Sequence, residues 1–176
     1  MTDADKVVKW LESLKIPEGP KAGKPLKLAP FQRRFVRGAF KKSTDVAVLS
    51  VGRGNAKSAL SAGIALGSLM GVWDRQPRRE ITIAARTRDQ ASIVVEYARG
   101  FLANLDEETQ ADFTYRQNPR LELEYHGDGG GHMLRGIAAD SKNALGGSPT
   151  LCLLDERGHW PADKGDDLEA ALLSGL

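Results

Sequence analysis

The sequence has little cysteine. Cys152 is the only one, and a chain with a single thiol cannot form an intrachain disulfide. Small secreted domains held together by disulfides are therefore excluded, and we expect the reducing environment of the cytoplasm. Apolar runs long enough to span a bilayer are also missing, and the charged residues 1–10 lack the apolar core of a signal peptide. The three histidines have no metal-ligand spacing, so no zinc site is expected.

A large excess of charge of one sign is missing too. The formal net charge is +2 and the pI is about 8.7. These values permit contact with DNA but fall short of the basic stripe of a dedicated DNA-binding protein. What is present is enough apolar sequence for one core, 41% of 176 residues, together with 19 glycines. We therefore expect one globular domain whose glycine-rich turns approach a ligand closely.

The first quarter of the chain predicts two helices joined by an irregular linker. Apolar residues recur at helical spacing over residues 3–14, whereas residues 15–27 are rich in Lys, Pro and Gly. Pro30 suits the first turn of the second helix. The chain is accordingly divided into an N-terminal helix and linker, residues 1–27, expected to be an appendage, and a domain over residues 28–176.

Beyond the second helix, strand and helix signals alternate along the chain. The expected strands are 46–51, 80–85 and 151–154, and the expected helices run over about 57–73 and 89–105. This alternation is typical of an α/β domain with a mainly parallel sheet flanked by helices.

Two further segments fall between these elements. Residues 113–116 and 121–125 predict an inserted antiparallel β-hairpin, and the glycine-rich residues 127–131 predict a mobile surface loop. Gly63, Gly67 and Gly71 recur every fourth residue and predict close packing of their helix against the sheet.

A glycine-rich turn links the first expected strand to its helix and reads Gly52-Arg53-Gly54-Asn55-Ala56-Lys57-Ser58. This context is typical of a phosphate-binding loop, in which backbone N–H groups face the β-phosphate, an ammonium reaches the β- and γ-phosphates and a hydroxyl binds Mg²⁺. Lys57 and Ser58 fit the last two roles. The consensus G-x-x-x-x-G-K-[ST] requires glycine where this sequence has Val51 and Ala56. The loop is thus a variant, and weak affinity, an inactive site or an ordinary βα turn remain open.

The expected strand at 151–154 ends in two carboxylates, Asp155 and Glu156. A strand of a parallel sheet delivers such groups to the edge where ligands bind, so Asp155 could hold Mg²⁺ and Glu156 could polarise an attacking water. A glutamate beside the metal ligand favours hydrolysis over phosphoryl transfer to a metabolite. Asp-Glu after an apolar run is also common in surface turns, so this motif indicates a nucleotide site only in combination with Lys57 and Ser58.

Together these motifs resemble the ATPase domain of large terminase subunits of tailed bacteriophages. The resemblance rests on the variant loop with Arg53 four residues before the lysine, and on the Leu-Leu-Asp-Glu strand. Residues 28–32 are similar to the adenine-binding motif of that family, and residues 85–91 to its second strand-to-helix junction. The resemblance implies a P-loop NTPase of the additional-strand catalytic-glutamate type. Such a domain hydrolyses MgATP to move double-stranded DNA into a capsid.

The resemblance also implies roles for single residues. Gln32 would read the adenine edge with Phe31 packing nearby, and Arg53 would contact the γ-phosphate. The implied catalytic residues are Glu156, Arg53 and Lys57, and the implied Mg²⁺ ligands are Ser58 and Asp155. The residues implied to bind nucleotide are Phe31, Gln32, Gly52, Arg53, Gly54, Asn55, Ala56, Lys57, Ser58 and Ala59.

Two departures from the family stand out. Related motors have an arginine, supplied to the neighbouring subunit, in a stretch that here reads Asn143-Ala144-Leu145-Gly146-Gly147. Lys142 and Arg135 are the nearest cations. The C-terminal nuclease domain and the last sheet strands of the family have no counterpart either, so the resemblance predicts a truncated chain with an incomplete sheet.

Partners and location follow from the same resemblance. It implies ATP as substrate, Mg²⁺ as cofactor, and double-stranded DNA, the portal and the small terminase subunit as partners. The active form would be a homo-oligomeric ring in the cytoplasm of the bacterial host, without membrane contact. Two alternatives remain open, a non-catalytic remnant that binds nucleotide or DNA and a helicase-like translocase.

Overall fold

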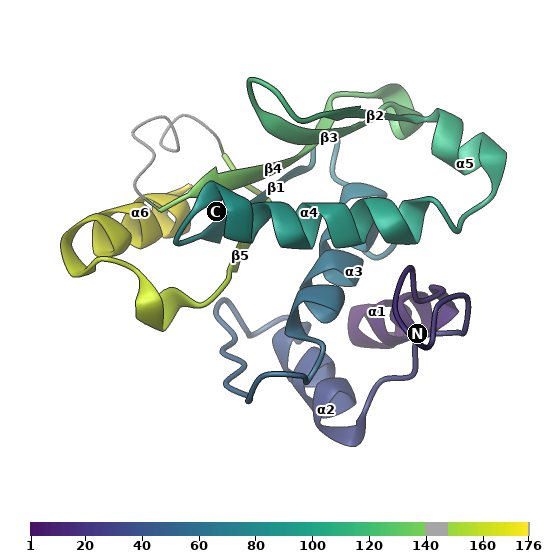
Figure 1. The fold of residues 1–176 in the computed structure, drawn as a ribbon, viewed down its shortest axis with the longest axis horizontal. Coiled ribbons are helices and arrows are strands. Elements are labelled where there is room, and N and C mark those ends of the chain that lie inside the picture. The colour runs from purple at the N-terminus through teal and green to yellow at the C-terminus, as the bar shows by residue number, and fades with distance from the viewer. Residues whose placement is uncertain (140–147, 176) are drawn as a thin grey trace.

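A five-stranded sheet forms the centre of the computed structural model, which describes residues 1–139 and 148–175 (Figure 1). The strand order is β2-β3-β4-β1-β5. The strands are β1 (Glu80–Ala85), β2 (Phe113–Arg116), β3 (Leu121–Tyr125), β4 (His132–Ala138) and β5 (Leu151–Leu154). Strands β4, β1 and β5 are parallel, whereas β2 and β3 form an antiparallel hairpin whose second strand pairs with β4. The expected α/β class and the inserted hairpin are confirmed.

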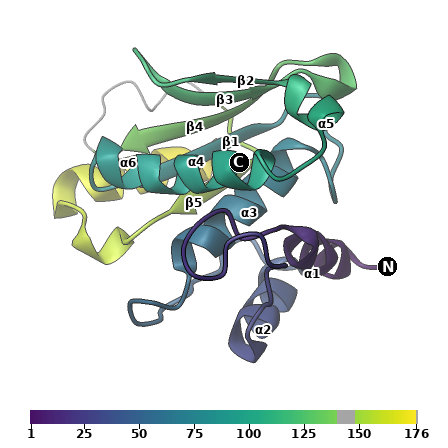
Figure 2. The ribbon, with the colours of Figure 1, turned by 45° about the vertical axis from the view of Figure 1, so that its right-hand side comes forward.

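Helices cover both faces of the parallel part of the sheet (Figure 2). They are α1 (Asp3–Ser13), α2 (Pro30–Ala39), α3 (Lys57–Leu69), α4 (Arg88–Leu102), α5 (Glu107–Ala111) and α6 (Ala162–Ser174). Successive residues of a strand face opposite sides, so Ile81 and Ile83 of β1 join the main core with α3 and α4, while Ala84 joins a smaller cluster with Leu168 and Leu172 of α6. Burial on both faces explains why apolar residues of β1 occur on both of its sides.

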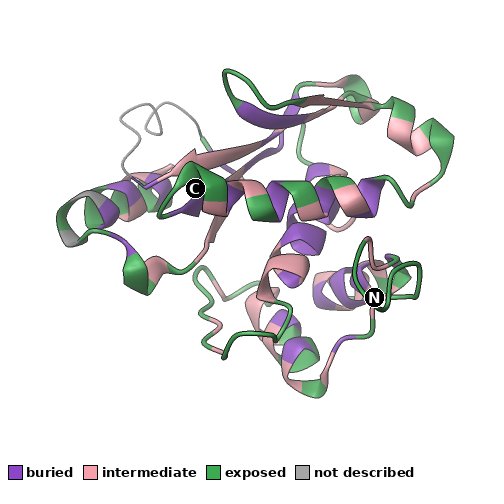
Figure 3. Ribbon diagram, in the orientation of Figure 1, coloured by how far each residue is buried: buried purple, intermediate pink, exposed green. Residues whose placement is uncertain are grey.

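Helix α1 is part of the main core, so the expectation of an appended helix is wrong. Val7, Leu11 and Leu14 are fully buried, and Figure 3 shows buried residues along the side of α1 that faces α3. The Trp10 indole N–H donates to the Gly63 carbonyl of α3 at 2.8 Å. Helical periodicity identified the apolar face of α1, but it contained no information about the surface that buries this face.

Residues 46–51 do not form the expected strand. They have no strand assignment, and Val46 and Val48 are 61% and 84% exposed. A β-prone run becomes a strand only when a neighbouring edge accepts its backbone hydrogen bonds. Within the described residues, β5 pairs with β1 on one side only, and the 46–51 segment makes no ladder with its other edge.

Other differences concern boundaries and local signals. Helix α3 ends at Leu69 because Gly71 turns the chain at φ +69°, and α4 ends at Leu102. Strand β4 and helix α5 were not predicted. The glycine-rich segment after β3 forms a 3₁₀ turn, η1 (Gly127–Gly129), in which Asp128 pairs with the buried Arg79 at 3.3 Å. Among the described residues, no helix combines the length and the apolar character needed to cross a bilayer.

Candidate nucleotide-binding site

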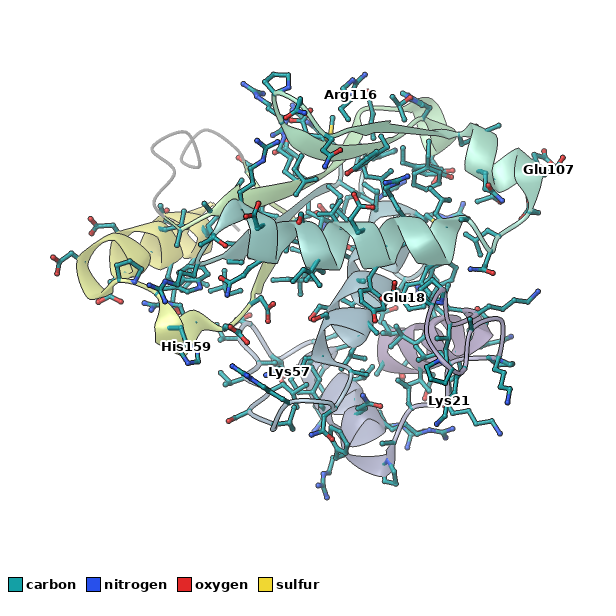
Figure 4. All side chains as sticks on the ribbon, in the orientation of Figure 1. Glu18, Lys21, Lys57, Glu107, Arg116 and His159 are labelled. Atoms are coloured by element: carbon teal, nitrogen blue, oxygen red, sulfur yellow. The ribbon has the colours of Figure 1, made fainter. Side chains whose placement is uncertain are left out.

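A hollow of about 520 Å³ separates residues 45–51 from the carboxyl end of β5. Lys57 at the start of α3 lines one side of it, and Asp155 and Glu156, which follow β5, line the other. Figure 4 shows Lys57 and His159, another lining residue, at the same end of the molecule. The hollow brings together three of the charged residues that the sequence nominated, from segments about a hundred positions apart.

The loop before α3 is exposed from Gly52 to Ala56. Two residues adopt the left-handed backbone region, Gly54 at φ +79° and Ala56 at φ +53°, and the Asn55 side-chain amide donates to the Gly52 carbonyl at 3.0 Å. Ala56 is the N-cap of α3 without a side-chain cap. The first N–H groups of α3 therefore need a partner, and an anion is a suitable one.

The Lys57 ammonium lies under this loop and donates to the Val51 carbonyl at 3.3 Å. This contact holds the end of the 46–51 segment close to the start of α3. Ser58 and Ala59 follow in the first turn of the helix and are half-buried, and Arg53 is exposed at the tip of the loop. Neither Ser58 nor Arg53 lines the hollow.

The two carboxylates are held at the carboxyl edge of the sheet by backbone contacts. The Asp155 N–H donates to the Ala84 carbonyl of β1 at 2.8 Å, and the Trp160 indole donates to the Asp155 carbonyl at 2.9 Å. Burial and the neighbouring Glu156 raise the pKa of the Asp155 carboxyl, while the nearby Lys57 ammonium lowers it. A cation in the hollow would relieve the same repulsion between the two carboxylates.

Arg157 is a residue of this site that the sequence did not reveal. It begins the 3₁₀ turn η3 (Arg157–His159) after β5, and its guanidinium pairs with Asp166 and Glu169 of α6. Arg157 also lies over the Trp160 ring at 5.3 Å. The acidic residues of α6 thus fasten that helix to the end of β5. The only sequence signal for a position of Arg157 in this site is that it directly follows Glu156.

Helix α2 reaches the loop through Gln32, which is only 7% exposed. The Gln32 side-chain N–H donates to the Asn55 carbonyl at 3.1 Å, and its amide oxygen accepts from the Ala29 N–H at 2.9 Å. Both ends of this amide are therefore engaged within the chain. Phe31 is half-buried and faces residues 47–51 across a neighbouring hollow.

The sequence offered Arg135 and Lys142 as cations that could act on a neighbouring subunit, and the structure describes only Arg135. Arg135 of β4 pairs with Glu122 at 3.0 Å and lies 3.9 Å from Glu80, so it serves the sheet surface. Lys142 and the stretch 143–147 lie outside the described residues.

An α/β domain with a loop-to-helix turn and paired carboxylates around one hollow has the arrangement of a P-loop ATPase domain. Residues 33–169 match the sequence model of the family "Terminase large subunit, ATPase domain". Because this match covers most of the chain, the protein belongs to the ATPase domain family of the large terminase subunit.

Individual relatives agree with this assignment. The chain is 33% identical over 182 residues to the large terminase subunit of Enterobacteria phage HK97, an alignment that covers 97% of this chain and 33% of the relative. It is similar to the crystal structure of the HK97 large terminase, with a TM-score of 0.80, 30% identity and coverage of 97% of this chain and 35% of that one. The chain therefore spans about a third of the length of these relatives.

The fold also matches the ATPase domain of the large terminase of Thermus phage P74-26. The TM-score is 0.62 at 21% identity, with coverage of 83% of this chain and 60% of that chain. This likeness supports the α/β architecture of the ATPase domain.

Proposed function

We propose that this chain hydrolyses MgATP as the ATPase module of a motor that moves double-stranded DNA into a phage capsid. The observation that carries the proposal is the hollow in which Lys57 meets Asp155 and Glu156, within a chain of the terminase ATPase family. ATP brings a cluster of anionic charge on its phosphates. Lys57 and Asp155 at the hollow supply an ammonium and a position for Mg²⁺, and the adjoining loop and first turn of α3 supply N–H groups.

The residues at and around the hollow have different roles in the proposed hydrolysis. Lys57 binds the β- and γ-phosphates once its ammonium leaves the Val51 carbonyl, and the exposed N–H groups of the loop donate to phosphate oxygens. Glu156 orients and polarises the attacking water, and Arg53 reaches the γ-phosphate from the loop tip. Phe31 and Gln32 of α2 would contact the adenine, as the family resemblance implies, and Gln32 already donates to the Asn55 carbonyl of the loop.

The donor set around Asp155 suits Mg²⁺. This ion is bound in such sites by one or two protein oxygens together with substrate phosphates and water, so Ser58 and Asp155 are sufficient. A group of three acidic, His or Cys ligands is not found among the described residues. When bound, Mg²⁺ neutralises charge on the β- and γ-phosphates.

The wider assignment follows from the family and belongs to the same proposal. The portal and the small terminase subunit are the partners, a homo-oligomeric ring is the active form, and the host cytoplasm is the location. A purely nucleotide-binding role is the second candidate, because Ala56 replaces the consensus glycine and the Lys57 ammonium is held by the loop itself.

Binding and turnover of ATP by Lys57→Ala and Glu156→Gln test the proposal. We expect Lys57→Ala to lower the affinity for MgATP by at least about tenfold, since one charge-assisted contact contributes about 1.5–3 kcal/mol. Glu156→Gln should retain binding and lose hydrolysis. Lys9→Ala, an exposed lysine of α1 far from the hollow in sequence, is the control. Binding without hydrolysis in the parent chain would favour the nucleotide-binding role, and absence of binding would contradict both.

A further inference from the structure

The charge of this chain is divided unevenly along its length. Residues 1–44 contain eleven Lys or Arg against four Asp or Glu, whereas the other residues contain fourteen against nineteen. The small net charge of +2 therefore hides a basic N-terminal quarter and an acidic remainder. Such asymmetry is typical of a chain that presents one charged surface to a polyanion.

Helix α2 concentrates this charge on one surface. A shallow hollow of about 790 Å³ is lined there by seven residues, of which four are cationic and none is acidic. The cations are Arg33, Arg34, Arg37 and Lys41, which we call the α2 basic face, and all four are exposed. In Figures 1 and 2, α2 lies at the end of the molecule farthest from the hairpin, with its outer side open.

Two of these cations repel each other within the helix. Arg33 and Arg37 lie four residues apart on α2, and like charges at this spacing destabilise a helix by about 0.2–0.5 kcal/mol per pair, whereas Lys41 lies just beyond the end of α2. Glu12 neutralises Arg33 at 2.6 Å. Arg37 lies close enough to Asp5 to help lower the pKa of that carboxyl, after the contacts of Asp5 with Thr2. Among the described residues, no ion pair neutralises Arg34 or Lys41.

We propose that the α2 basic face binds the phosphate backbone of duplex DNA. The inference rests on the proposed function, in which duplex DNA is the transported polymer, and it assigns the surface that holds this polymer. The hollow is shallow and open rather than enclosed, so it suits a long anion better than a small ligand. Guanidinium groups bind phosphate oxygens in a bidentate manner. Contacts with phosphates imply binding without sequence preference.

The opposite side of α2 connects this surface to the nucleotide site. Val36 packs in the core and Gln32 donates to the Asn55 carbonyl of the loop, while Arg34 and Arg37 are exposed. The helix that would contact DNA is therefore the helix that holds the phosphate-binding loop. A load on the α2 basic face would therefore reach the loop through the buried Gln32 amide.

Titration of the full chain with a fluorescent duplex of mixed sequence, at a series of salt concentrations, tests the proposal. The triple variant Arg34→Gln, Arg37→Gln and Lys41→Gln should bind the duplex at least about tenfold more weakly at low salt. Its slope of log affinity against log salt should fall by about 0.9 for each phosphate that is no longer neutralised, about 2.7 in all. The control variant Arg99→Gln, Arg116→Gln and Arg120→Gln removes the same charge from α4 and the hairpin, and it should bind as the parent does.

The two proposals fail in different ways. Equal losses of affinity in both triple variants, or equal binding of the duplex and of polyglutamate by the parent, would overturn the α2 basic face. So would a parent that binds MgATP but no duplex, and that result would leave the ATP site intact. A parent that binds duplex through the α2 basic face but binds no nucleotide would support the surface and overturn the proposed ATPase. MgATP affinity of the first variant should equal that of the parent.

Discussion

Ala56 and Glu156, one on each side of the candidate site, both hold a backbone that L-residues avoid. Their φ angles are +53° and +48°. A side chain with a Cβ atom costs about 1–2 kcal/mol in this region, and strain of this kind is typical of functional sites. Glycine is the residue that tolerates it, and the consensus phosphate loop has glycine at the position of Ala56. Ala56 thus holds a backbone conformation that the glycine of the consensus would adopt without this strain.

Replacement of Ala56 by glycine should stabilise the protein. We expect the free energy of unfolding of Ala56→Gly to rise by up to about 1 kcal/mol, because the relief of left-handed strain exceeds the entropy that glycine adds to the unfolded chain. Ala103→Gly is the matched control, since Ala103 is exposed and right-handed at φ −61°. It should lose about 0.5–1 kcal/mol. Urea unfolding of the three proteins measures both values, and the same sign of change in both variants would contradict the explanation.

His132 gives the stability of the chain a pH dependence at the residue scale. Its ring is fully buried, its Nδ1 accepts from the Arg79 N–H at 3.2 Å, and its Nε2 has no hydrogen-bond partner among the described residues. Burial lowers the pKa of His132, and the charge of Arg79 lowers it further, while Asp128 acts in the opposite direction. Protonation therefore favours the unfolded chain.

This shift predicts the sign of a measurable difference. Because the pKa of His132 is lower in the folded state, the unfolded chain takes up the proton first, and stability is lost as the pH falls through about 6.5. His132→Phe removes this proton site. Its free energy of unfolding, measured relative to that of the parent, should improve as the pH is lowered from 8 to 5. Parallel stability curves for the two proteins would show that His132 has the same pKa in the folded and unfolded states, and would contradict the lowered pKa.

At the scale of elements, the predictions that succeeded were those in which one segment contains its own signal. The glycine turn before α3, the carboxylates after β5 and the hairpin turn are local patterns, and the first two were expected to meet because strand ends gather at one edge of a sheet. Residues 46–51 failed because a strand also requires a partner edge, which no local pattern encodes. Strand β4 was missed for a similar reason, since Arg135 and Gly136 interrupt its apolar residues.

The glycines of α3 also show that a local sequence pattern can predict close packing without identifying the element that packs there. Their four-residue spacing correctly predicted close packing, but Gly63 and Gly67 face α1 rather than the sheet. A Cβ atom on Gly63 would lie 2.6 Å from the Leu11 side chain, and one on Gly67 would lie 2.5 Å from the rings of Trp10 and Trp73. The groove on α3 therefore fixes how closely α1 approaches.

Substitution of Gly67 tests this contact between helices. Gly67→Ala should lower the free energy of unfolding by about 1–3 kcal/mol, because two tryptophan rings must move. Gly38→Ala is the matched control in α2, where an added Cβ atom meets nothing within 4 Å. It should raise the same quantity by about 0.4–1 kcal/mol. Thermal or urea unfolding distinguishes the two, and a neutral Gly67→Ala would mean that α1 can shift without cost.

At the scale of the whole molecule, the N-terminal quarter is joined to the rest by one core. The sequence suggested a boundary between residues 27 and 28, since the linker before it breaks regular structure. The linker is nevertheless tied back to the chain, because the Leu26 N–H donates to the Leu14 carbonyl at 2.8 Å and Lys15 bridges to Pro25. Leu28 beyond it is buried in the same cluster as Leu11.

Removal of residues 1–27 should therefore abolish cooperative folding of what remains. The deletion uncovers the surface of α3 that now buries Val7, Leu11 and Leu14, and each fully buried side chain of this kind contributes about 1.5–3 kcal/mol. Their sum approaches the whole stability of an ordinary domain, about 5–15 kcal/mol. Leu11→Ala alone should cost about 2–5 kcal/mol, whereas the exposed Lys9→Ala on the same helix should be nearly neutral.

Circular dichroism during thermal unfolding measures all three variants, and the deletion variant gives the clearest result. A sigmoidal transition close to that of the parent would show that residues 28–176 fold alone and that α1 only rests on them. A broad, non-cooperative loss of signal would instead mean that the core crosses the sequence boundary. The second outcome has a consequence for function, because α2, with its contact to the phosphate-binding loop, packs against α1. Loss of α1 should then lower MgATP affinity even though no residue of the hollow has been removed.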